Sequence, residues 1–162
     1  MRTSFDPRKT IRTTIGTYWW TKEEGDLLTI NVTDNNNDTV RVPMRLDEEF
    51  KTESLDNLPV LIMKMVNVTY DPANIGADSR KVEAYIDIDL VFTDTDNIDS
   101  TSFGKKVMDA LQNLVRFWQC TFASTNNMFV NIESVRYIPE PDAHQVVFHY
   151  VCTIYCIWYD LC

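Results

Sequence analysis

The fold of this chain is decided by one continuous stretch, Lys81-Val-Glu-Ala-Tyr-Ile-Asp-Ile-Asp-Leu-Val-Phe92. Apolar and polar residues alternate along it, which is the period of a strand with one buried and one solvated face. The buried face would carry Val82, Ala84, Ile86, Ile88, Leu90 and Phe92, and the solvated face Glu83, Tyr85, Asp87 and Asp89. We therefore expect a long, half-buried β-strand over residues 81–92.

The residues after this strand change to a helical period. An acidic turn, Thr93-Asp-Thr-Asp-Asn-Ile-Asp99, comes first, and its end offers side-chain oxygens that can cap a helix. Apolar residues then recur three and four positions apart, as on the buried stripe of an amphipathic helix: Phe103, Val107, Leu111, Leu114, Val115 and Trp118. A strand and a helix with matching apolar faces predict a sheet with a helix packed on it.

The residues before the central strand predict a helix, a hairpin and a further strand. Asp6 and Pro7 form a good helix start, so we expect a short helix over residues 7–20. Two alternating segments flank the turn Asp34-Asn-Asn-Asn-Asp38, which predicts a β-hairpin over 27–45. Residues 58–70 begin with apolar side chains on both faces, which is typical of a strand buried on both sides.

The residues after the central helix predict two more strands. Residues 124–127 break the helical pattern, and Phe129 to Ile138 reads as a strand. Pro139-Glu-Pro-Asp-Ala143 is a turn, because proline cannot donate to a ladder inside a sheet. Residues 145–159 then form a strand that is apolar or aromatic on both faces, so it needs cover from its own domain or from a neighbouring subunit.

Together these elements indicate a single α+β domain over residues 1–162, with the hairpin at 27–45 and the sheet-and-helix core at 58–162. We expect a mainly antiparallel sheet with an N-terminal helix and one long helix packed on one face. A chain of 162 residues is long enough to bury a core of its own.

Charge and hydropathy limit the classes of function. The formal net charge is −9 and the isoelectric point about 4.6, so the surface repels nucleic-acid phosphates and anionic membranes, and we expect no sequence-specific nucleic-acid contact. No run of about 18 apolar residues occurs, and the polar start of the chain has no signal-peptide core. We therefore expect a protein made in a reducing cytoplasm, without a membrane partner.

The four cysteines are consistent with that compartment. Cys152 and Cys156 lie four positions apart on one face of a predicted strand, which is too far for a disulfide. A zinc pair is one interpretation, but no second Cys/His pair has ligand spacing, so buried free thiols are favoured for these two residues; the roles of Cys120 and Cys162 stay open.

Signatures of catalysis are weak. There is no glycine-rich phosphate loop and no nucleophile elbow, and the histidines, His144 and His149, belong to no motif. Asp94-x-Asp96-x-x-Asp99 matches half of a calcium loop, without its glycine and its bidentate glutamate. We therefore expect no enzyme, no metal and no cofactor.

The order of elements supports a more specific hypothesis. An N-terminal helix precedes a strand entered through Leu58-Pro59-Val60-Leu61-Ile62; a loop and the strand Arg80 to Phe92 follow. A Thr/Asp-rich turn then leads into the helix Gly104-Lys-Lys-Val-Met-Asp-Ala-Leu-Gln-Asn-Leu114, and paired strands follow. Over residues 55–160 this order resembles the tail-terminator (tail-completion) proteins of tailed phages and tailed archaeal viruses. The hairpin at 27–45 departs from that pattern.

The resemblance implies a structural virion protein of the neck or tail, assembled in the host cytoplasm. Its copies would form a six-membered ring that caps the tail tube protein and joins it to the head–tail connector, with genomic DNA passing through. The acidic residues facing the lumen or a partner rim would be Glu83, Asp87, Asp89, Asp94, Asp96 and Asp99. The subunit interface would comprise Phe148, Tyr150, Tyr155, Trp158 and Tyr159.

Two other classes remain open at this stage. One is a head-completion or connector adaptor protein of the same neck region. The other is a small α+β ligand-binding or hydrolytic domain that uses His149 with a carboxylate.

Overall fold

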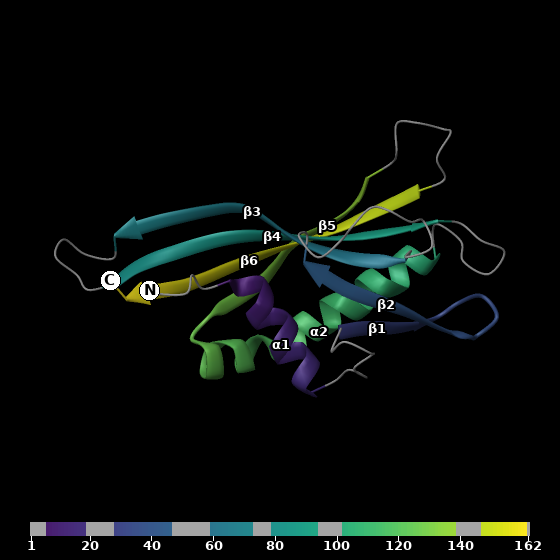
Figure 1. Cartoon of the computed structure of the whole chain (residues 1–162), viewed down its shortest axis with the longest axis horizontal. Coiled ribbons are helices and arrows are strands. Elements are labelled where there is room, and N and C mark those ends of the chain that lie inside the picture. The colour runs from purple at the N-terminus through teal and green to yellow at the C-terminus, as the bar shows by residue number, and fades with distance from the viewer. Residues whose placement is uncertain are drawn as a thin grey trace.

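The protein has a mixed α+β architecture, seen in a computed structural model that describes residues 6–18, 28–46, 59–72, 79–93, 102–138 and 147–161. The elements in these ranges are α1 (Pro7–Tyr18), β1 (Leu28–Thr33), β2 (Thr39–Leu46), β3 (Val60–Pro72), β4 (Ser79–Thr93), α2 (Ser102–Asn126), β5 (Phe129–Ile138) and β6 (Val147–Leu161). The strands form a six-stranded sheet in the order β1-β2-β3-β4-β6-β5 (Figure 1). Its neighbours are antiparallel except β2 and β3, so the expected class and mainly antiparallel sheet are confirmed.

β4 is the centre of this sheet. It pairs with β6 from Ser79↔Leu161 to Thr93↔Val147, and with β3 along most of the same length. Every second residue of β4 from Val82 to Phe92 is fully buried, and the residues between them are half-buried. The alternation predicted from the sequence is therefore confirmed: successive side chains of a strand point to opposite faces.

α2 contributes its apolar stripe to the core cluster that includes the inward face of β4. Val107, Leu111 and Val115 belong to the same core cluster as the inward-facing residues of the strand. The rings of Phe92 and Phe103 meet edge to face with their centroids 5.2 Å apart. This packing follows from the helical spacing of the stripe, which gathers its members on one side of the helix.

α2 extends beyond the stripe that the sequence predicted. The expected break at 124–127 is wrong at its beginning, because the helix continues to Asn126. Asn127 then adopts a left-handed backbone with φ of 51°, and the amide of Met128 donates to the carbonyl of Phe122 at 3.1 Å. Such a left-handed residue reverses the chain at the end of a helix, and here it leads directly into β5.

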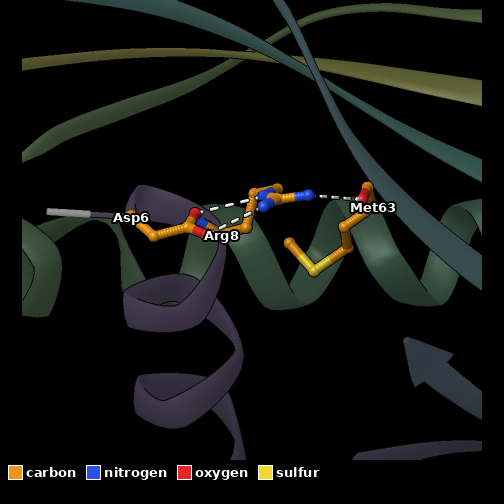
Figure 2. A network of polar contacts seen from close by, with 3 residues as sticks. All are labelled: Asp6, Arg8 and Met63. Atoms are coloured by element: carbon orange, nitrogen blue, oxygen red, sulfur yellow. Dashed lines mark hydrogen bonds and ion pairs between the residues drawn. The ribbon is translucent and has the colours of Figure 1, made fainter. Parts of the chain in front are cut away.

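The start of α1 is fixed to β3 by a polar network (Figure 2). The Asp6 carboxylate accepts the backbone amide of Arg8 at 3.0 Å and forms an ion pair with its guanidinium at 2.8 Å. The same guanidinium donates to the carbonyl of Met63 at 3.3 Å. Burial opposes ionisation of Asp6, but the hydrogen bonds and charge of Arg8 outweigh it and lower the pKa of Asp6. Asp6 therefore caps the helix, and the guanidinium of its ion-pair partner Arg8 joins the helix to the sheet.

The predicted hairpin is confirmed as β1 and β2. The Asp34 carboxylate accepts the amides of Asn36 and Asp38 at 2.8 and 3.0 Å, and Asn37 adopts a left-handed backbone with φ of 62°. These are the local bonds and the backbone freedom for which Asn and Asp are favoured in turns. The amine of Lys106, on α2, donates to the carbonyl of Thr33 at 3.1 Å, so the helix also contacts the end of β1.

The other expected elements are present with shifted ends. α1 is described from Pro7 to Tyr18, and the expected residues 19 and 20 lie outside the described part. β3 begins and ends two residues later than expected, and β6 continues two residues further, to Leu161. The first residues of β3 are buried on both faces, as predicted. The expected turns at 94–99 and 139–143 lie outside the described residues.

Gly104 provides a test of the packing at the start of α2. A Cβ at this position would overlap the ring of Tyr150, which is held between Phe92 and Tyr137. We expect Gly104→Ala to cost about 1–3 kcal/mol from overpacking, offset by about 1 kcal/mol of helix propensity. Urea unfolding measures the difference. In a Tyr150→Ala background the same change should become stabilising; a stabilising Gly104→Ala in the native background would contradict the packing.

Candidate functional site

The face of the sheet opposite the core carries the carboxylates that the sequence placed together. Glu83, Asp87 and Asp89 alternate with the buried residues of β4 and are half-buried. Their side chains share this outer face because they lie two and four positions apart on one strand. The predicted grouping of these three residues on one face is therefore present.

Two of these carboxylates have partners on the neighbouring strands. The Asp89 carboxylate forms an ion pair with the Lys64 amine of β3 at 2.8 Å. The Asp87 carboxylate accepts a hydrogen bond from the Thr153 hydroxyl of β6 at 2.7 Å. Asp87 and Asp89 thus join β4 to the strands on both sides instead of forming a bare acidic surface.

Glu83 belongs to a third polar group at the other end of β4. It forms an ion pair with Lys81, and the Lys81 amine lowers the pKa of Glu83, with a further contribution from the Tyr155 hydroxyl. The hydrogen bond to Glu83 in turn raises the pKa of Lys81. The ring of Tyr155 lies 5.1 Å from that of Tyr85 across β4 and β6. Both side chains of the pair are therefore held charged at neutral pH.

The acidity of the chain lies mostly outside its regular framework. The described residues include twelve Lys or Arg and ten Asp or Glu, a net charge of +2; the rest of the chain has three and fourteen, a net charge of −11. Segments 47–58, 94–101 and 139–146 alone contain ten Asp or Glu and one Lys. Asp94, Asp96 and Asp99 are among these acidic residues and lie outside the described ranges.

The three acidic segments attach at one end of the sheet. Segment 47–58 leads into the start of β3, segment 94–101 leaves the end of β4, and segment 139–146 joins β5 to β6. The registers Val60↔Val91, Thr93↔Val147 and Ile138↔His149 place these strand ends next to one another. The described strand ends that adjoin these three acidic segments therefore lie together at one end of the sheet.

The residues predicted to form a subunit interface are divided between the two faces of β6. Tyr150 and Trp158 lie opposite inward-facing residues of β4, and Trp158 is only 7% exposed. Tyr155 and Tyr159 lie on the outer face, where Tyr159 is 62% exposed. The side chain of Phe148 is outside the described part of the chain, although its backbone pairs with β4.

β6 is also an inner strand, because β4 and β5 pair with its two edges. The edge of the sheet next to β6 is formed by β5, a strand for which no interface was predicted from the sequence. Four of the large apolar side chains exposed in the described residues lie on this strand: Phe129, Val135, Tyr137 and Ile138. A sequence signal was available, since the strand contains these residues and only two charged ones.

The described thiols lie on α2 and β6. Burial raises the pKa of both Cys152 and Cys156 to about 12, and for Cys152 the charge of Asp87 contributes further. These two cysteines are free and buried as expected, whereas the free Cys120 of α2 is exposed. No group of three or more His, Cys, Asp or Glu within the described ranges could hold a metal ion.

Comparison with known proteins adds no assignment: the chain matches no protein-family model and no curated protein sequence. Neither helix that the structure describes is long and apolar enough to cross a membrane.

The ion pair of Glu83 predicts a specific titration. We expect the pKa of Glu83, followed by NMR, to lie below its ordinary value, and Lys81→Met to raise it because the ammonium is lost. The stabilisation from this pair is present above the unfolded-state pKa of the carboxyl and is lost as pH falls through the lowered native pKa. Lys64→Met serves as the control, because Lys64 pairs with Asp89. An unchanged Glu83 midpoint in Lys81→Met would refute the pairing.

Proposed function

We propose that this chain is a structural subunit of a viral neck or tail. Copies of it form a ring, a hexamer in the proposed assembly, that terminates the tail tube and joins it to the head–tail connector. Genomic DNA passes through the ring without sequence-specific contact. The order of helix, strands and helix that resembles the tail terminators supports the virion assignment, and the charge distribution supports the ring.

The observation that carries the proposal is the separation of charge along the sheet. The acidic segments attach at one end, whereas the described framework has a net charge of +2. An acidic channel or rim repels phosphates and releases no counterions, so DNA can slide instead of binding. We assign Asp94, Asp96 and Asp99 to this lumen or rim.

The carboxylates of the outer face have a different role in this proposal. Asp87 and Asp89 are engaged by Thr153 and Lys64, and Glu83 by Lys81. Their charges are therefore largely compensated within the subunit. We assign them to holding β4 between its neighbours, and we assign the exposed Tyr159 to contact with an adjacent subunit.

The arrangement of the helices fits an assembled subunit. Ile11 of α1 and the stripe of α2 share one core cluster with the buried face of β4. We propose that both helices cover this one face of the sheet, as Figure 1 draws them. The other face then remains available to neighbouring copies or to the tube.

Assembly onto tail tubes tests the proposal directly. We expect light scattering to give the mass of a ring, alone or upon addition of tail tubes, and negative-stain images to show density capping one end of each tube. A chain that caps no tube and forms no ring under either condition would exclude this function.

The acidic rim has its own test. Replacing Asp94, Asp96 and Asp99 with Asn should leave assembly intact and strengthen binding of double-stranded DNA, with a salt dependence that the native protein lacks. The matched control replaces Asp71, Asp109 and Asp160 with Asn and changes the net charge equally. Asp71 and Asp160 pair with Lys81 and Arg80 at the opposite end of β4, and Asp109 lies on α2. Equal DNA binding by both triple variants would show that total charge alone, and not the acidic end, sets the repulsion.

A further inference from the structure

β5 has a free edge in the described structure. It is the last strand in the order β1-β2-β3-β4-β6-β5, and its pairing is with β6 alone (Figure 1). The backbone amides and carbonyls along such an edge can pair with another strand, and natural edges are usually blunted by charges, bulges or a covering element. β5 therefore has to be protected along its length or paired.

α2 protects only the beginning of this edge. The side-chain amide of Gln119 donates to the carbonyl of Val130 at 3.1 Å and lies 3.4 Å from the side-chain oxygen of Asn131. A bulge then displaces the register between Ile132 and Ser134. Beyond the bulge lie residues 134–138. Within the described residues, no such side-chain hydrogen bond joins them to α2, and their side chains are mostly exposed.

The apolar residues of this open part are suited to a second copy. Val135 and Tyr137 lie on the helix-covered face, since they are opposite Cys152 and Tyr150, and they are 37% and 47% exposed. A two-fold axis perpendicular to the sheet keeps the same face of both copies on the same side. Antiparallel pairing centred on Val135 therefore places the Val135 side chains of the two copies against each other. The Tyr137 ring of each copy lies beside them, and the apolar cluster continues to Tyr150.

The charges of the strand are complementary in the same arrangement. Glu133 and Arg136 are the two charged residues of β5, and both are exposed. With Val135 at the centre, Arg136 of one copy lies opposite Ser134 of the other, one residue along the strand from Glu133, the residue that the bulge inserts. Each copy therefore sets one carboxylate beside one guanidinium of the other, so two opposite-charge contacts form and no like charges face each other.

We infer that the open part of β5 pairs antiparallel with β5 of a second copy, which gives a two-fold dimer of the free chain with one continuous sheet. This goes beyond the ring proposal. A ring with the tube on one side and the connector on the other has two different faces, so its copies meet through two different surfaces. The two-fold pair is therefore the form in which the free chain covers its edge before assembly.

A charge-exchange series tests this pairing. We expect native protein to be dimeric by light scattering, and Arg136→Glu or Glu133→Arg to weaken the dimer by roughly tenfold, because each puts like charges together. The double variant Glu133→Arg/Arg136→Glu should restore the dimer, and so should mixing the two single variants. Val66→Lys, at an exposed valine of β3, is the control that should leave the mass unchanged. Thermal unfolding confirms that each variant is folded.

Cross-linking fixes the register and separates the two proposals. In a Cys120→Ser background, which removes the exposed native thiol, Val135→Cys should form a disulfide with Val135→Cys of the second copy under mild oxidation, whereas Val66→Cys should not. A monomer at all concentrations would overturn the two-fold pair in favour of a strand supplied by another protein. A ring without the Val135→Cys cross-link would also overturn it while supporting the proposed function. A cross-linked dimer that never caps tail tubes would support the pair and exclude the ring.

Discussion

The structure depends on β4, which buries one face in the core and pairs along both edges in long antiparallel ladders. Its inward-facing residues, from Val82 to Phe92, are fully buried, and both edges of its backbone are paired. A strand in this position cannot slip by one residue without moving its whole apolar set to the opposite face. The register of β3, β6 and α2 is therefore set relative to this strand, and the outer-face contacts of Asp87 and Asp89 follow from the same register.

The elements with a strong period were predictable from the sequence, and their ends were less so. The alternation of β4, the stripe of α2 and the Asn-rich turn each have a local physical cause that a single sequence displays. The end of α2 was misplaced because Phe122, which is fully buried, continues the packing through a polar stretch that looked like a break. Tertiary packing overrides local preference in such a place.

The surfaces were harder to predict because they depend on strand order. β6 has the more apolar sequence and was expected to contact a neighbour, but it lies inside the sheet. β5 has the weaker pattern but forms the edge, and that position exposes Tyr137 and Ile138. The partners of the acidic residues were hidden for the same reason, since Lys64 and Asp89 lie on different strands and meet only when β3 and β4 pair.

The order of β4 and β6 in the chain has a consequence for synthesis. β4 pairs with β6, for example Ile86 with Ile154. In the sequence, α2 and β5 lie between these two strands. As the chain leaves the ribosome, β4 appears with one edge and much of its apolar surface unsealed until β6 emerges. Contacts between distant residues form slowly, so in this interval the nascent chain is most exposed to chaperones and to mispairing.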